Sequence, residues 1–250
     1  TAATSHLEAS IRDNASIIRL DKPLEQIVLQ EDPDLVVTHN PREALRVLGN
    51  AQLSSTYPVV VVAHNEIVSE SRSKSFFLSP LLKRVNPRAA LHIAVSSRAA
   101  AGPQCRKARR IVVHLLGAEF DPSTPPDTTP WPAETRRRIV VLGRLSPQKN
   151  LPLLLKAILN TASVLRDSSA HIAIVGEGQL RNELSIYIQQ NNLSDVVSLS
   201  APRRTPDGVL AAADVLLIPS RHEGGPLTMY EGLLAGCRVI TTPVGAAPDL

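Results

Sequence analysis

Short apolar runs alternate with amphipathic stretches from Arg138 to the end of the chain. The apolar runs are rich in β-branched residues and often continuous, as in Ile139-Val140-Val141-Leu142. Continuous runs are typical of strands buried on both faces of a parallel sheet, with helices between them in the sequence. The pattern predicts strands at Ile139–Leu142, His171–Val175, Val196–Leu199, Val215–Pro219 and Val239–Thr242.

Four helices are expected between these strands. The first runs from Leu151 to Leu165 with Asn150 as its N-cap, and the third begins behind the hydroxyl of Thr205 and ends at Ala213. The other two are predicted by an apolar stripe and by a proline start with a left-handed glycine end. Their residues are Leu180, Leu184, Tyr187 and Ile188 for the second helix, and Pro226 and Gly236 for the fourth.

The first half of the chain holds a second set of strand candidates, which indicates another α/β unit. Between the two units, Asp121 to Pro132 contains five prolines and resists both helix and sheet, so the interdomain linker is expected there. We expect a partial Rossmann-like domain at residues 1–128 and a second Rossmann-like domain at residues 137–250. The strand candidates of the first unit are Leu35–Thr38, Val59–Ala63, His92–Val95 and Ile111–Leu115.

Composition narrows the class of protein. With 250 residues, of which 43% are apolar, and with only two cysteines, the chain is neither disordered nor a disulfide-rich domain. An aromatic content of 3% supports a single-stranded nucleic-acid binder poorly. No apolar segment is long enough to span a membrane and none directs export, so a cytoplasmic location is expected.

Cations gather in three runs, at Lys83 to Arg88, Arg106 to Arg110 and Arg136 to Arg138. Such runs are usually solvated faces, but they also suit an anionic ligand or lipid head group. The apolar residues beside the first run suggest peripheral contact with the inner face of a membrane, although Pro80 is expected to interrupt any helix there and a buried face is the plainer interpretation. These apolar residues are Phe76, Phe77, Leu78, Leu81 and Leu82.

The segment from Pro219 to Gly232 is the most informative, because a strand end feeds through glycines into a helix. The first amides of such a helix lack partners and carry partial positive charge, which favours a diphosphate. Glu223 in the turn and Glu231 in the helix can accept hydrogen bonds from hydroxyl groups. A solvated loop acid and a surface helix position are the plain alternatives for these two residues.

Two further strand-to-helix turns are expected at the same edge of the sheet. The first, Gly143 to Asn150, carries Arg144 and Lys149, which can neutralise the same diphosphate. The second, Gly176-Glu177-Gly178, is followed by Arg181 where the dinucleotide fingerprint needs glycine, so a dehydrogenase is disfavoured. Asp32-Pro33-Asp34 has the spacing of a metal motif but precedes a strand, and the end of a helix explains it better.

Taken in order, these motifs resemble the GT-B fold glycosyltransferases of group 1, also called family 4, from about Asp34 to Leu250. The resemblance implies two Rossmann-like units, the N-terminal one incomplete, and transfer of a sugar from a nucleoside-diphosphate donor with retention and without metal or cofactor. The acceptor would be an unidentified glycan, lipid or small molecule. The motifs are Gly143-Arg144-Leu145, Lys149-Asn150, Val175-Gly176-Glu177-Gly178, Ala213-Asp214-Val215, Pro219-Ser220, and Glu223 with Glu231.

The resemblance also implies roles for individual residues. Arg144 and Lys149 would contact the diphosphate, Glu223 would hold the sugar, and Glu231 would take the ribose hydroxyls. His64 is similar in place to the histidine that faces the donor sugar, with a structural histidine at a strand end as the alternative. The backbone that follows Glu223 would help to hold the donor, at Gly224, Gly225, Leu227 and Thr228.

The sequence differs from the family in two places, and two other functions are possible alternatives. Thr1 to Leu20 shows no strand with a glycine-rich turn, and the family continues beyond Leu250, so the chain is expected to be a fragment. A sugar-nucleotide epimerase on the same scaffold is one alternative function. A non-catalytic module that binds a nucleotide sugar is the other, and fold alone does not decide between them.

Overall fold

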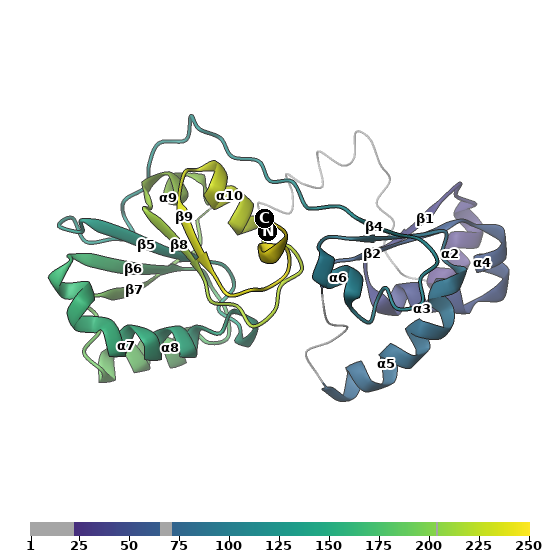
Figure 1. Ribbon diagram of the computed structural model, residues 1–250, viewed down its shortest axis with the longest axis horizontal. Helices are drawn as coiled ribbons and strands as arrows, with labels where there is room; N and C mark the ends of the chain where they lie inside the picture. The colour runs from purple at the N-terminus through teal and green to yellow at the C-terminus, as the bar shows by residue number, and fades with distance from the viewer. Residues whose placement is uncertain (1–22, 66–71, 204) are drawn as a thin grey trace.

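The protein consists of two parallel α/β units joined by an extended segment (Figure 1). The computed structural model describes residues 23–65, 72–203 and 205–250, so the prediction about Thr1 to Leu20 lies outside the described residues. One sheet has four strands in the order β1-β2-β3-β4, and the other has five in the order β7-β6-β5-β8-β9. All strand pairs are parallel, which confirms the predicted α/β class with two Rossmann-like units.

The N-terminal unit carries a small core on its sheet. Val59 and Val61 of β2 pack with Val47 and Leu48 of α3 and with Leu53 of α4. The strands are β1 (Val36–Thr38), β2 (Val59–Ala63), β3 (Leu91–Ala94) and β4 (Ile111–Val113). The helices are α2 (Leu24–Glu31), α3 (Pro41–Gly49), α4 (Ala51–Thr56), α5 (Arg72–Val85), η1 (Asn86–Arg88) and α6 (Ser97–Ala101).

The C-terminal unit has helices on both faces of its sheet, α7 and α8 on one and α9 and α10 on the other (Figure 1). Neighbouring residues of β5 supply the two cores, because Val141 packs on one face and Val140 on the other. The strands are β5 (Arg137–Leu142), β6 (Ala170–Val175), β7 (Val197–Ser200), β8 (Val215–Ile218) and β9 (Arg238–Thr241). The helices are η2 (Pro147–Lys149), α7 (Leu151–Asp167), α8 (Arg181–Gln190), α9 (Asp207–Ala212), α10 (Leu227–Leu234) and η3 (Ala247–Asp249).

Asn150 occupies the predicted N-cap position of α7, but its side chain caps no amide of the helix. Its backbone is left-handed, and its Oδ1 accepts a hydrogen bond from Arg221 Nε at 3.0 Å. The predicted cap of the third helix is wrong. The third helix begins at Asp207 with Pro206 at the cap position, so the hydroxyl of Thr205 does not cap it. The predicted left-handed end of α10 is confirmed, because Gly236 has a φ of +82°.

The segment between the sheets is neither helix nor strand from residue 114 to residue 136, as its prolines predict. It is nevertheless held against the C-terminal unit. The amide of Asp127 donates to the carbonyl of Gly208 at 2.8 Å, and Nε1 of Trp131 donates to the carbonyl of Ile139 at 3.0 Å. The division into residues 1–128 and 137–250 stays a prediction.

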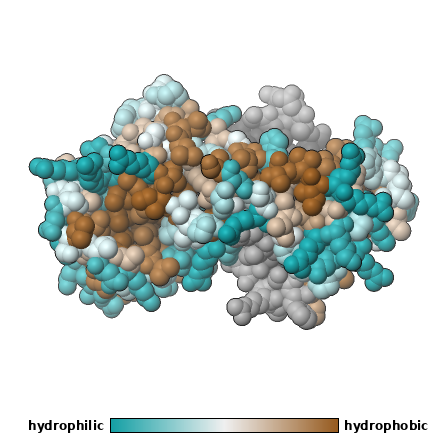
Figure 2. Space-filling model, viewed as in Figure 1, coloured by the Kyte–Doolittle hydropathy of each residue, from teal (hydrophilic) through white to brown (hydrophobic). Residues whose placement is uncertain are grey.

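Helix α5 differs from its prediction, because Pro80 lies inside it. Along this helix Leu82 is buried, while Phe77 is 69% exposed and Leu81 is 52% exposed, so a wholly buried apolar face is wrong for these two residues. The side chain of Phe76 lies outside the described residues. Figure 2 shows apolar residues at the surface of both units. Within the described ranges, no helix is long and apolar enough to cross a membrane.

Candidate functional site

Three turns meet at the carboxyl edge of the C-terminal sheet, following β5, β6 and β8. The turns after β5 and β6 are bonded to each other, since the amide of Leu145 donates to the carbonyl of Glu177 at 2.8 Å. Glycine permits this approach, because a Cβ on Gly176 would lie 1.9 Å from the carbonyl oxygen of Gly143. The predicted convergence of the turns at one edge of the sheet is therefore confirmed.

A cavity of about 360 Å³ opens between the turns after β5 and β6, residues 202, 203 and 206 before α9, and helix α10. A cavity of this size falls in the range that small ligands occupy. Arg144 and Thr228 both line it, although they lie 84 positions apart in the chain (228 − 144). Arg144 is exposed, and its guanidinium group makes no hydrogen bond or ion pair among the described residues. The lining comprises Leu142, Gly143, Arg144, Val175, Gly176, Glu177, Pro202, Arg203, Pro206 and Thr228.

Glu223 lies beside the cavity at the centre of a hydrogen-bonded cluster. Its Oε1 accepts from Lys149 Nζ at 2.7 Å and from Ser220 Oγ at 2.7 Å. Its Oε2 accepts from Gln148 Nε2 at 3.3 Å. The residue is only 8% exposed, which excludes the alternative of a solvated loop acid.

Lys149 connects this cluster to the cavity. A Cβ on Gly143, which lines the cavity, would lie 3.1 Å from Cε and 3.4 Å from Nζ of Lys149. The ammonium group therefore passes over the turn after β5 before it reaches Glu223. This placement puts a cation next to the turn that lines the cavity.

Helix α10 presents its first turn to the cavity. Its N-terminal amides have no side-chain cap, since Pro226 occupies the cap position. Thr228 lines the cavity and Glu231, three positions later, lies on the same side of the helix. Burial raises the pKa of Glu231, and the nearby carboxylate of Asp207 raises it further. Leu227 is 47% exposed and does not line the cavity.

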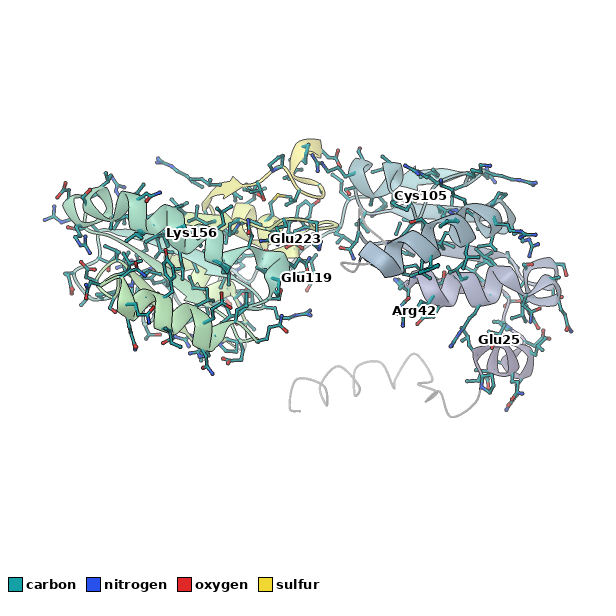
Figure 3. All side chains as sticks on the ribbon, turned by 90° about the horizontal axis from the view of Figure 1, so that it is seen from below. Glu25, Arg42, Cys105, Glu119, Lys156 and Glu223 are labelled. Atoms are coloured by element: carbon teal, nitrogen blue, oxygen red, sulfur yellow. The ribbon has the colours of Figure 1, made fainter. Side chains whose placement is uncertain are left out.

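The turn after Glu223 packs against the N-terminal unit. A Cβ on Gly224 would lie 1.3 Å from the carbonyl oxygen of His64, at the end of β2, and one on Gly225 would lie 3.3 Å from Cδ1 of Leu116. Figure 3 shows Glu223 on the side of the C-terminal unit that faces the N-terminal unit. A second contact joins the units, because the amide of Ser97 donates to Asp249 Oδ2 at 2.8 Å.

His64 has a histidine partner within its own unit. Nε2 of His64 and Nδ1 of His39 lie 2.8 Å apart, and the two rings stack with their centres 5.1 Å apart. Burial lowers the pKa of His64, and the neighbouring His39 lowers it further. The structure thus places His64 at the junction of the units, with its backbone against Gly224.

The structure brings most predicted site residues together but not all of them. Arg144 and Thr228 share the cavity, Lys149 contacts Glu223, and His64 contacts the glycine turn. Leu227 does not line the cavity, and Glu231 lies one helical turn from Thr228. The roles of these residues stay predictions. Among the described residues, no group of three or more His, Cys, Asp or Glu side chains could hold a metal ion.

Sequence reasoning missed Gln148, Ser220 and Arg203. The first two lie directly in the predicted turns, but a glutamine and a serine carry no charge to mark them. Arg203 lines the cavity and is held by the linker, since its Nε donates to Asp127 Oδ2 at 2.7 Å and its Nη2 donates to Thr129 Oγ1 at 2.8 Å. No sequence signal links a residue near α9 to a proline-rich linker about 75 positions earlier.

The fold and the site define a class: an α/β protein of two parallel units with a cationic cavity at the carboxyl strand ends, next to a buried glutamate. Residues 129–250 match the model of the family described as glycosyl transferases group 1. Residues 129–250 are therefore identified as a group 1 glycosyltransferase domain.

Part of the chain is also similar in sequence to individual glycosyltransferases. The chain is 35% identical over 109 residues to UDP-Gal:alpha-D-GlcNAc-diphosphoundecaprenol alpha-1,3-galactosyltransferase of Escherichia coli, which is 42% of this chain and 27% of that protein. It is 28% identical over 140 residues to the phosphatidylinositol N-acetylglucosaminyltransferase GPI3 subunit of Saccharomyces cerevisiae, which is 54% of this chain and 30% of that protein. The match thus covers less than a third of the length of these curated relatives.

Solved structures share the fold of both units. Anabaena HepE in complex with UDP-glucose superposes with a TM-score of 0.75 at 18% identity, over 100% of this chain and 72% of that chain. The pneumococcal O-GlcNAc transferase GtfA in complex with UDP and GlcNAc gives a TM-score of 0.67 at 17% identity, over 90% of this chain and 45% of that chain. The GT-B-like arrangement of the two units is therefore shared with known transferases.

Proposed function

We propose that the chain carries the donor site of a retaining glycosyltransferase that uses a nucleoside-diphosphate sugar. The observation that supports this most directly is the cavity lined by Arg144 and Thr228, with Lys149 and Glu223 in contact beside it. Two cations and the free amides of α10 suit a diphosphate, and a buried carboxylate suits the hydroxyl groups of the sugar. Structures of the same fold hold UDP and UDP-glucose, which supports this class of ligand.

The proposed reaction breaks the bond between the anomeric carbon and the β-phosphate oxygen and forms a bond from that carbon to an acceptor oxygen on the same face. The nucleoside diphosphate leaves with the electron pair of the broken bond, and its phosphate takes the proton of the acceptor hydroxyl. Arg144 and Lys149 stabilise the negative charge that develops on the leaving phosphate. Glu223 and the glycine turn orient the sugar, so catalysis rests on positioning and charge, with no metal among the catalytic groups.

The acceptor is proposed to be lipid-linked, with α5 as the contact to the membrane. Phe77 and Leu81 are exposed one helical turn apart, and the exposed Arg84 follows in the next turn. Apolar side chains beside cations suit an anionic membrane surface. Relatives whose names include a diphosphoundecaprenol or phosphatidylinositol acceptor support the same interpretation. A cytoplasmic location, which stays a prediction, would place the chain at the inner face of the membrane.

Calorimetric titration of the 250-residue chain with UDP, GDP, UDP-glucose and GDP-mannose tests the donor site. We expect at least one nucleoside diphosphate to bind, and Arg144→Ala to weaken its binding about 10-fold or more, because a charge-assisted contact to phosphate is lost. Arg137→Ala is the matched control, since Arg137 is an exposed arginine at the start of β5 and does not line the cavity. Binding of none of the four ligands, or equal loss in both variants, would refute the donor site.

The two alternatives differ from transfer in their products. An epimerase converts the donor to its epimer and glycosylates no acceptor. A binding module leaves the donor unchanged. Incubation of donor with lipid acceptors, followed by separation of the products, distinguishes the three functions. Glycosylated acceptor that disappears with Glu223→Ala supports the transferase.

A further inference from the structure

Three side chains hold Glu223, and only one of them is a predicted ligand-binding residue. Lys149 Nζ and Ser220 Oγ both donate to Oε1, each at 2.7 Å, and Gln148 Nε2 donates to Oε2 at 3.3 Å. Gln148 also donates to the carbonyl of His222 at 3.0 Å, so one amide group holds both the backbone and the side chain of this turn. Ser220 is 1% exposed, which leaves its hydroxyl directed at Glu223 within the core of the site.

The three donors differ in how a bound anion would affect them. A diphosphate in the cavity would compete with Glu223 for Lys149, because both are anions and the side chain of Lys149 lies over Gly143, which lines the cavity. Ser220 and Gln148 are neutral and have no such competitor. A carboxylate has about four acceptor sites, so these two donors leave capacity on both oxygens for other hydrogen bonds.

We propose that Ser220 and Gln148 are positioning residues that hold the carboxylate of Glu223 toward the donor sugar once Lys149 turns to the diphosphate. The proposal rests on the proposed function and deepens it. It predicts that the two residues affect recognition of the sugar and leave recognition of the diphosphate unchanged. A glutamate has three side-chain torsions, and without these donors its carboxylate would follow Lys149 toward the anion.

Two variant pairs separate positioning from packing. Ser220→Thr keeps the hydroxyl, whereas Ser220→Val has nearly the same volume and removes it, so their difference reports the hydrogen bond. Gln148→Leu removes the amide at a half-buried place, and Gln189→Leu on the exposed side of α8 is its control. Equal melting temperatures within each pair show that the fold is retained.

The measurement compares affinity for a nucleoside diphosphate with affinity for the corresponding nucleotide sugar, using UDP with UDP-glucose and GDP with GDP-mannose. We expect Ser220→Val and Gln148→Leu to bind the diphosphate within about 2-fold of the unaltered chain and the nucleotide sugar about 10-fold more weakly. Ser220→Thr should restore most of the sugar affinity.

Equal loss for both ligands, or no loss for either, would overturn the positioning role and leave the proposed donor site intact. Failure of the unaltered chain to bind any of the four ligands would instead overturn the proposed function, and the positioning role with it. If Ser220→Val does not fold, Gln148→Leu alone decides, because Gln148 lies at the surface of the site and its replacement leaves no buried void.

Discussion

The carbonyl oxygen of His64 lies 1.3 Å from the place where a Cβ on Gly224 would be built. His64 directly follows β2 of the N-terminal unit, and Gly224 follows Glu223 in the turn after β8 of the C-terminal unit. The absence of a side chain at Gly224 therefore sets how closely the two units approach. This contact joins the proposed donor site to the N-terminal unit.

Gly224→Ala is expected to separate the units or to displace the turn that carries Glu223. An added methyl group at 1.3 Å cannot be accommodated by a backbone carbonyl, and overpacking of this kind costs about 1 to 3 kcal/mol. We expect a lower melting temperature, a larger radius of gyration in solution scattering, and at least a 10-fold loss of transfer (about 1.4 kcal/mol). Gly117→Ala is the control, because nothing lies within 4 Å of its Cβ position. Equal behaviour of the two variants would contradict the close approach.

Binding of the nucleoside diphosphate should weaken as the solution becomes acidic. Burial and Asp207 raise the pKa of Glu231, so its carboxylate takes up a proton at a higher pH than an ordinary glutamate and then accepts hydrogen bonds from hydroxyls less well. We expect affinity to fall about 10-fold between about pH 7.5 and about pH 5 by titration calorimetry. Glu231→Gln should bind more weakly at about pH 7.5 and lose most of this pH dependence. An unchanged pH profile in the variant would show that another group titrates.

Stability should also depend on pH through His92, which is fully buried in β3 with both ring nitrogens lacking hydrogen-bond partners among the described residues. Burial lowers the pKa of His92 from 6.5 to about 4. The unfolded chain therefore binds a proton between these values while the folded chain does not, so stability is lost as pH falls through this window.

Denaturant unfolding at several pH values measures the effect of His92. His92→Leu should remove about 1 to 3 kcal/mol of the pH dependence of unfolding free energy between pH 6.5 and about 4. His114→Gln is the control, because His114 is exposed. A pH dependence that persists in His92→Leu would place the titrating group elsewhere.

Membrane contact through α5 is tested with vesicles. We expect the chain to float with vesicles of phosphatidylglycerol and phosphatidylcholine and to stay unbound with phosphatidylcholine alone, because the surface around Arg84 is cationic. The double variant Phe77→Ser and Leu81→Ser should reduce binding about 10-fold or more, since both side chains are exposed on one side of the helix. Leu153→Ser on α7, where the side chain is 58% exposed, is the control. Equal binding to both vesicle types would refute an electrostatic contact.

The periodicity of the chain predicts the strands of both sheets to within one or two residues, because each strand is a short run of apolar, mostly β-branched residues. It does not predict how the turns are completed. Asn150 has the chemistry of a cap, yet Arg221 takes its side-chain oxygen, and Pro80 is accommodated inside α5 at a surface position. Contacts of this kind depend on residues far apart in sequence, which local propensity does not contain.

The candidate site was likewise predicted only in part from the sequence. Charge and glycine spacing mark Arg144, Lys149 and Glu223 from the sequence, and the structure places the last two in contact. Burial of Glu223 and the hydrogen bond from Gln148 follow only from the meeting of two turns about 75 positions apart. Ser220 lies three positions before Glu223 in the same turn, but its neutral hydroxyl does not mark it as a donor to this carboxylate. Sequence reasoning thus finds the groups that carry charge and misses the neutral groups that hold them.

The linker has a consequence for how this protein tolerates change. Asp127 and Thr129 accept hydrogen bonds from the guanidinium of Arg203, which lines the cavity. The linker between the two sheets therefore also shapes the place where a ligand would bind. Insertions, deletions or proteolytic cleavage in this linker would alter the cavity even when both sheets stay folded. Connecting segments usually tolerate changes in length. A change in the length of this segment would instead weaken ligand binding.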